Sequence, residues 1–320
     1  IKLSVVGAAA TAAGQEPKDK MAAPPAFDWA GKSLKQLQAE MKAGHLSSAE
    51  LTGAYLKRIE AVKPLLHSVL EVSPDAVQVA AALDQERKEK GARGPLHGIP
   101  VLVKDNIEAG DKLQTSAGSL ALAGAPPKND AFAVKKLRDA GAVILGKANL
   151  SEWANIRSMR STSGWSARGG QSRNPYALDR SPIGSSSGSG VALAADLCAV
   201  ALGTETNGSI IAPCSAMALV GLKPTVGLVS RTGVIPVSPS QDTIGPMGRS
   251  VEDVATLLGA MTGFDPEDLA MRGAGRKAEE DYLKALDRDG LKGKRLGVAR
   301  GLIGKNLLYR KVIEAQLKEL

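Results

Sequence analysis

The chain has 320 residues, 43% of them hydrophobic, which is enough to bury one large α/β domain or two smaller ones. Its net charge of +8 suggests nucleic-acid binding, but Lys and Arg are scattered and aromatic residues make up only 3%. We therefore expect a basic surface and no nucleic-acid partner. Its three histidines lack a matching Cys or carboxylate spacing, so we expect no metal and no cofactor.

The N-terminal segment Ile1–Gly14 is apolar and ends in Ala-x-Ala-like residues, which resembles the tail of a secretory signal. It is too short to span a membrane. Residues 1–25 are therefore expected to be a signal-peptide remnant or a disordered extension. The first alternative predicts a periplasmic or secreted protein, and the second a cytoplasmic one.

Three helices are predicted in the first third of the chain, and none carries a chemical motif. Ser33 and Ser47 are their N-caps in two capping boxes, and the pair Ser73-Pro74 begins the third helix, which runs to about Lys90. Helical spacing in the second helix ends before Pro64.

Alternating strands and helices follow, which predicts an α/β fold. The expected strands are Ile99–Val103, Ala142–Leu145 and Val200–Gly203, and the expected helices are Ala131–Ala140, Gly190–Ala199, Ser250–Met261 and a helix start at Ser151–Ile156. We expect residues 26–320 to form one domain with a mixed central sheet covered by helices on both faces. The last segment, Leu307–Leu320, is an amphipathic helix without a cap, so the domain looks truncated at its C-terminus.

Two Ser/Gly-rich turns lie within the segment Ser181–Ser215, on either side of an apolar run. The first offers three adjacent serines, Ser185, Ser186 and Ser187, and local sequence does not choose among them. The second, Thr206 to Ser209, places small residues before a serine, so its N–H groups can converge on an oxyanion. Lys104 ends an apolar strand, where burial favours a neutral amine. The alternative is a lysine whose ammonium group reaches solvent.

These motifs resemble the amidase signature family of Ser–Ser–Lys hydrolases over roughly residues 27–263. The resemblance rests on IPVLVKDN at Ile99–Asn106, KANLSEWANIRS, SGWSARGGQSRNPYALDRSPIGSSSGSG, GTETNGSI and VGLKPTVGLVSRTGVIPVSPSQDTIGPM. Within the family the chain is most similar to bacterial peptide amidases.

The resemblance implies hydrolysis of linear carboxamides, on a small or peptide amide substrate, through an acyl-enzyme. It makes Ser209 the nucleophile, Ser185 the relay serine in a cis peptide arrangement, and Lys104 the base. The oxyanion would be held by the N–H groups of Thr206, Asn207, Gly208 and Ser209. Ser186 and Ser187 would orient Lys104 or turn the backbone, and Asp105 would support the site.

Other chemistries fit the residues less well. No GxSxG elbow accompanies His45, His67 or His97, and we place His97 in a loop near the site entrance. The run at Gly184–Gly190 lacks the Gly-Lys-Ser/Thr that ends a phosphate loop. Cys198 is expected to be buried, and its pairing with Cys214 is left open.

Two functional alternatives remain open. One is an amidotransferase A-type subunit that supplies ammonia to a partner, and the other is a catalytically incomplete fragment. Asn207, Glu205 and Ile211 stand where many family members have Gly, Asp and Arg, which weakens assignment to the transamidating tRNA subunit. We expect a monomer or a homodimer.

Overall fold

The computed structural model describes residues 27–124, 126–272, 278, 279 and 281–319. The predicted extension over residues 1–25 lies outside these ranges, so its nature and the location of the protein stay predictions. The chain divides into two compact units, residues 1–281 and residues 282–320, which are described separately.

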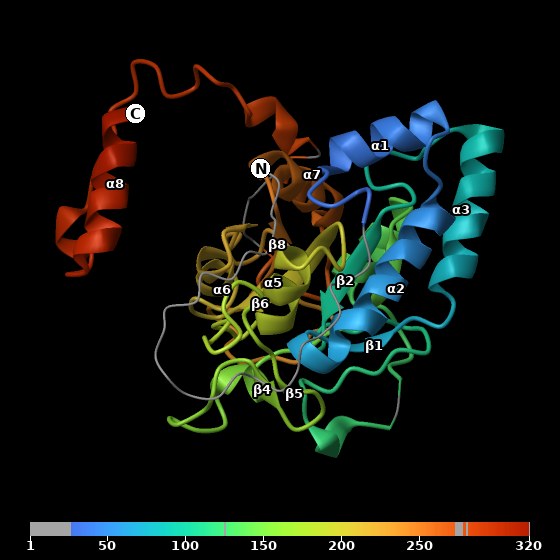
Figure 1. Cartoon of the computed structure of the whole chain (residues 1–320), viewed down its shortest axis with the longest axis horizontal. Helices are drawn as coiled ribbons and strands as arrows, with labels where there is room; N and C mark the ends of the chain where they lie inside the picture. The colour runs from blue at the N-terminus through green and yellow to red at the C-terminus, as the bar shows by residue number, and fades with distance from the viewer. Residues whose placement is uncertain (1–26, 125, 273–277, 280, 320) are drawn as a thin grey trace, which may run out of the picture. The chain divides into compact units, whose positions relative to one another are not determined.

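A six-stranded mixed sheet organises the first unit (Figure 1). Its strand order is β1-β3-β2-β6-β8-β7, with β2, β3 and β6 parallel and the other pairs antiparallel. The strands are β1 (Val69–Val72), β2 (Pro100–Lys104), β3 (Val143–Ala148), β6 (Val200–Glu205), β7 (Val220–Gly221) and β8 (Thr243–Gly248). Strands β2, β3 and β6 are buried along their whole length, as their apolar runs predict.

Helices cover both faces of this sheet, as predicted. The connections from β2 to β3 and from β3 to β6 cross the sheet in opposite directions, so right-handed crossovers place α4 (Phe132–Asp139) and α5 (Ser187–Ala194) on opposite faces. Helix α5 packs on β2, β3, β6 and β8, while α4 packs on α7 (Val251–Met261), which contacts β8. The remaining long helices are α1 (Leu34–Ala43), α2 (Ser48–Leu66) and α3 (Ala76–Lys90).

The helix caps follow the sequence, but several boundaries do not. Ser33 and Ser47 close the predicted capping boxes, and Ser250 caps α7. However, α2 continues past Pro64 to Leu66 and ends at His67 in the left-handed conformation, while α3 begins after Asp75. Pro64 has no N–H to donate to the preceding turn, and the helix ends two residues after it.

Sequence reasoning missed several elements of the first unit. They are β1, β7, β8, α6 (Ile211–Ala216), the 3-10 helix Leu120–Leu122, and the hairpin of β4 (Trp165–Ser166) with β5 (Gly170–Gln171) inside the Ser-rich segment of residues 158–189. The predicted helix start at Ser151–Ile156 is a short 3-10 helix, Glu152–Asn155.

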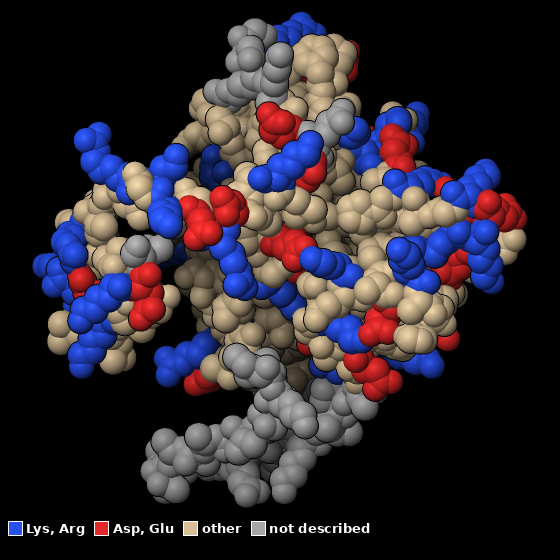
Figure 2. All heavy atoms as spheres, turned by 90° about the horizontal axis from the view of Figure 1, so that it is seen from above, with Lys and Arg blue, Asp and Glu red and all other residues tan. Residues whose placement is uncertain are grey.

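The second unit contains α8 (Leu307–Glu319), which confirms the predicted amphipathic helix, after two short 3-10 helices, Tyr282–Ala285 and Arg300–Leu302. Among the described residues of both units, no helix is both long and apolar enough to cross a membrane. On the face that Figure 2 shows, Asp and Glu side chains lie among the Lys and Arg side chains.

Candidate active site

The site lies at the carboxyl edge of the parallel strands. Because β2, β3 and β6 run the same way, their last residues, Lys104, Ala148 and Glu205, meet at one edge of the sheet. The two Ser-rich turns end at the same edge, and the N–H of Ser186 donates to the carbonyl of Ser209 at 3.0 Å. Residues far apart in sequence therefore meet at one place.

Lys104 is fully buried, and within the part of the chain that the structure describes its Nζ has uncharged hydrogen-bond partners only. Nζ lies 2.8 Å from Ser185 Oγ, 2.8 Å from Thr204 Oγ1 and 3.2 Å from the Thr204 carbonyl oxygen. Burial lowers the pKa of Lys104 from 10.5 to about 7, although the charges of Glu205 and Asp242 oppose this shift. At neutral pH the amine is thus able to accept a proton.

Ser185 lies at the turn before α5 and is fully buried. The peptide bond between Gly184 and Ser185 is cis, as the resemblance implies. The Ser185 carbonyl accepts the N–H of Ser151 at 3.0 Å, which ties this turn to the segment after β3. Of the three adjacent serines, it is Ser185 whose hydroxyl contacts Lys104.

Ser209 lies between β6 and α6, in a turn that the Glu205 carboxylate holds together. That carboxylate accepts the N–H groups of Gly208 at 2.8 Å, Ile210 at 2.6 Å and Ile211 at 3.0 Å. Gly208 has φ of +79°, a left-handed conformation that favours glycine at this position. Ser209 is 9% exposed, so it is the most accessible of the three predicted catalytic residues.

The four predicted oxyanion donors are not equivalent. The N–H of Gly208 already donates to Glu205, so an oxyanion would compete with a carboxylate for it. Within the described residues, the N–H groups of Thr206, Asn207 and Ser209 have no hydrogen-bond partner. Thr206 anchors the turn from its other side, through a 2.5 Å bond from its hydroxyl to Asp242.

Ser186 and Ser187 bind the backbone and do not touch Lys104 Nζ. Ser186 Oγ donates to the carbonyl of Thr204 at 3.1 Å and accepts its N–H at 3.2 Å. Ser187 Oγ lies 3.4 Å from Ser151 Oγ and donates to the Ser185 carbonyl at 3.4 Å. Of the two predicted roles, these contacts fit the shaping of the backbone.

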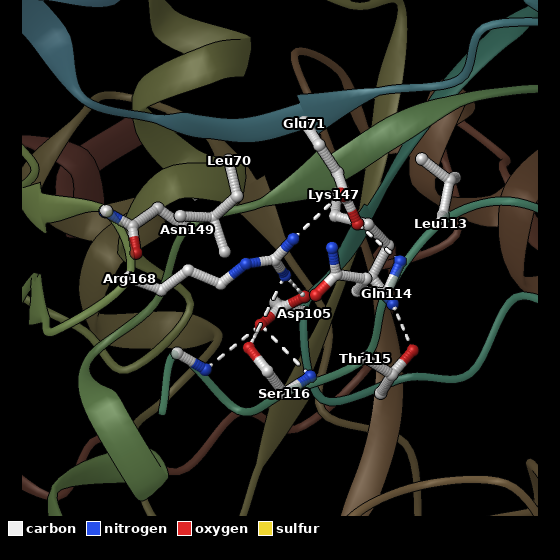
Figure 3. Close-up of polar contacts among 12 residues, drawn as sticks. Leu70, Glu71, Asp105, Leu113, Gln114, Thr115, Ser116, Lys147, Asn149 and Arg168 are labelled. Atoms are coloured by element: carbon white, nitrogen blue, oxygen red, sulfur yellow. Dashed lines mark hydrogen bonds and ion pairs between the residues drawn. The ribbon is translucent and has the colours of Figure 1, made fainter. Parts of the chain in front are cut away.

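Asp105 is also buried and organises the chain that follows Lys104. Its Oδ2 accepts the hydroxyl of Ser116 at 2.5 Å and the N–H of Gly118 at 3.0 Å, while Arg168 binds its Oδ1 at 3.0 Å (Figure 3). These contacts hold Asp105 beside Lys104, and its supporting role stays a prediction.

Sequence reasoning missed two residues that contact the lysine or its partner. Thr204 supplies two of the three acceptors for Lys104 Nζ, and Asn106 donates to Thr204 Oγ1 at 3.0 Å. Thr204 could have been found, because it ends an apolar run on the strand just before the nucleophile turn. The register of β2 beside β6 is a tertiary feature that the sequence alone does not reveal.

The remaining candidates lie outside this site. His97 is buried against α3, where its Nε2 lies 2.8 Å from the Leu83 carbonyl. It precedes the amino end of β2, whereas Lys104 lies at the carboxyl end, so our placement of His97 near the site entrance was wrong. His45 faces Glu40 and His67 caps α2. Cys198 and Cys214 are buried and free. The described residues contain no cluster of three or more His, Cys, Asp or Glu that could hold a metal.

Comparison with known proteins gives consistent matches. The sequence matches the Amidase family model over residues 50–319. A probable amidase of Arabidopsis thaliana is 49% identical over 269 residues, which cover 83% of this chain and 52% of that protein. A glutamyl-tRNA(Gln) amidotransferase subunit of Alkalilimnicola ehrlichii is 40% identical over 289 residues, covering 90% and 58%.

The fold has close neighbours among solved structures. The native peptide amidase of Stenotrophomonas maltophilia matches with a TM-score of 0.86 and 53% identity, over 92% of this chain and 61% of that one. The chain spans about half the length of the curated relatives it matches, for example 52% of the Arabidopsis protein.

Proposed function

We propose that this chain, which belongs to the amidase family, hydrolyses linear carboxamides through an acyl-enzyme on Ser209. The observation that carries the proposal is the buried Lys104, whose Nζ lies 2.8 Å from Ser185 Oγ and whose pKa is lowered to about 7. A neutral amine beside a hydroxyl is a competent general base at physiological pH.

In the proposed reaction Ser209 Oγ attacks the amide carbon, forming a C–O bond while the carbonyl electron pair moves to oxygen. The Ser209 proton passes to Ser185 Oγ as Ser185 gives its own proton to Lys104 Nζ. Collapse of the intermediate breaks the C–N bond, and the relay returns the proton to the leaving nitrogen. Water then cleaves the ester by the same relay. The relay needs the two serine turns to lie together, and the N–H of Ser186 joins them by donating to the Ser209 carbonyl at 3.0 Å.

The oxyanion in this proposal is held by N–H groups of Thr206, Asn207 and Ser209. The reason is that these N–H groups are unengaged among the described residues, whereas Gly208 donates to Glu205. A single oxyanion donor is worth roughly 2.7–4 kcal/mol in measured cases.

For the substrate we propose a peptide with a C-terminal amide. The support is the similarity to the peptide amidase of Stenotrophomonas maltophilia, at 53% identity over 92% of this chain.

A second candidate is an amidotransferase A-type subunit, favoured by the 40% identity to the Alkalilimnicola protein. Asn207, Glu205 and Ile211 depart from the residues that many family members have there, which argues for the hydrolase. An incomplete fragment is the third possibility and predicts no turnover by this chain.

The test is amide turnover by the purified chain without ATP or a partner, with Ser209→Ala as the matched inactive control. A set of C-terminally amidated peptides is compared with the same peptides as free acids and with glutamine. Release of ammonia from amidated peptides alone supports the proposal. Ammonia release from glutamine alone favours the amidotransferase role, and no release from any compound favours the fragment.

A further inference from the structure

A buried charged cluster surrounds the segment that follows Lys104, outside the set of catalytic hydroxyls (Figure 3). Its members are Glu71 on β1, Asp105, Lys147 on β3 and Arg168 on the β4–β5 hairpin turn. Asp105 and Lys147 are fully buried, and the Arg168 side chain is 11% exposed. Neither the predicted nor the observed catalytic set includes Glu71, Lys147 or Arg168.

Arg168 joins two carboxylates that belong to separate parts of the sheet. Its Nη1 lies 3.0 Å from Asp105 Oδ1, and its Nη2 lies 2.7 Å from Glu71 Oε2. The planar guanidinium can serve two carboxylates at once, which an ammonium group does less well. Arg168 N also donates to the Gly118 carbonyl at 3.0 Å, so its backbone and side chain both hold the segment 105–118.

The other members of the cluster hold the same segment at further points. Glu71 Oε1 accepts the N–H of Gln114 at 2.5 Å. Lys147 Nζ donates to the Ile107 carbonyl and, at 2.8 Å, to Thr115 Oγ1. In the β2–β3 register Lys147 pairs with Val103, so its side chain and that of Lys104 leave opposite faces of the sheet. The cluster therefore fixes the chain beyond Lys104 without touching Nζ.

We propose that Arg168 is a positioning residue for Lys104: by bridging Asp105 and Glu71 it holds the end of β2 in place. Lys104 and Asp105 are adjacent, and the Asp105 N–H is held by the Ala148 carbonyl at 3.1 Å, so a shift of Asp105 moves Lys104. Lys104 must stay within hydrogen-bond reach of Ser185, and a displacement near 1 Å can cost about a hundredfold in rate. This inference rests on the proposed amide hydrolysis.

The test compares Arg168→Gln, Arg168→Lys and Glu71→Gln with a matched control, Arg249→Gln. The Arg249 side chain is 16% exposed and lies 2.7 Å from Asp196. It also binds the Ala199 carbonyl, at the amino end of β6 and so at the opposite end of the parallel strands. The readouts are kcat and KM on an amidated peptide, and hydrogen–deuterium exchange of residues 105–118.

For Arg168→Gln we expect kcat to fall by about tenfold to a hundredfold with KM within about twofold, because alignment and not binding is lost. Arg168→Lys should fall between Arg168→Gln and the native chain. Hydrogen exchange of residues 105–118 should be faster in Arg168→Lys than in the native chain and fastest in Arg168→Gln. In Arg249→Gln both kcat and the exchange rate of this segment should equal those of the native chain.

Equal kcat in Arg168→Gln and Arg249→Gln, or a loss confined to KM, would overturn the inference. If Arg168→Gln does not fold, the kcat of Glu71→Gln decides instead. That change removes the ion pair between Arg168 and Glu71 and keeps the one between Arg168 and Asp105, and an unchanged kcat would overturn the inference. If the native chain turns over no amide, the proposed function fails. Hydrogen exchange then decides on Arg168 separately, and unchanged exchange at residues 105–118 would overturn its positioning role.

Discussion

Replacing Lys104 with methionine tests whether this lysine is held neutral by burial. Met has a similar length, fits an apolar strand end and cannot be charged. Lys104 is fully buried, with its pKa lowered to about 7 from 10.5 mainly by desolvation. The change should abolish amide turnover, and it should also alter the pH dependence of stability in a direction that follows from the pKa.

The magnitude follows from the size of this shift. Lowering the Lys104 pKa from 10.5 to about 7 corresponds to roughly 5 kcal/mol of folding free energy, at about 1.36 kcal/mol per pKa unit. Between these two pH values the unfolded chain binds a proton that the folded chain does not. The native protein therefore gains stability as pH rises through this window, and it carries the full cost below about pH 7.

In Lys104→Met there is no buried amine to protonate, so this cost is absent. The variant loses the three hydrogen bonds of Nζ, which together contribute about 3 kcal/mol to stability. It should then be more stable than the native chain by about 2 kcal/mol at pH 6, and less stable by about 3 kcal/mol near pH 11. The pH-dependent part of this difference does not depend on the hydrogen-bond estimate.

Urea unfolding followed by tryptophan fluorescence measures this difference at pH 6, 8 and 10. The three tryptophans, Trp29, Trp153 and Trp165, all lie in the first unit and report on its unfolding. The exposed Lys57 gives a control variant, Lys57→Met. A stability difference that is the same at all three pH values would refute the reasoning that Lys104 is neutral when folded.

Two further predictions concern the groups around Lys104. In Glu205→Gln the charge that raises the Lys104 pKa is removed, so the acid limb of kcat/KM should move to lower pH; movement to higher pH would contradict this. The rate of that variant should also fall, because three N–H groups lose their carboxylate acceptor. Lys104→Arg and Ser185→Ala should each cost several orders of magnitude in kcat, and the double variant little more, since both break one relay. Effects that multiply in the double variant would show that the two residues act independently.

The positions of the candidate catalytic residues could be predicted because each lies in a local motif. Lys104 ends an apolar run, and Ser185 and Ser209 lie in turns rich in small residues. The resemblance then chose Ser185 among three serines, and the structure places its hydroxyl beside Lys104.

The partners of these residues could not be predicted, because they come from distant parts of the chain. Arg168 meets Asp105 across 63 positions and Thr204 meets Lys104 across 100. Such contacts depend on strand register and loop path, which local periodicity does not encode. In the sequence, Arg168 is one of several polar residues in the Ser-rich segment of residues 158–189, and nothing local distinguishes it.

The missed elements have local causes. Strand β8 contains Gly245, Pro246 and Gly248, which are residues that weaken or interrupt strands. Strand β1 has only four residues, and α6 has only six and includes Pro213. These elements form because the sheet and the turn around Glu205 supply their partners.

The most direct test of the account is covalent labelling of the nucleophile. The native chain is treated with a fluorophosphonate probe across pH 5 to 9, and the labelled peptide is identified by mass spectrometry. The account predicts labelling on Ser209 alone, with a rate that rises as Lys104 loses its proton near pH 7, and no labelling in Ser209→Ala or Lys104→Met. Labelling that persists in Ser209→Ala and maps to Ser185, Ser186 or Ser187 would contradict it.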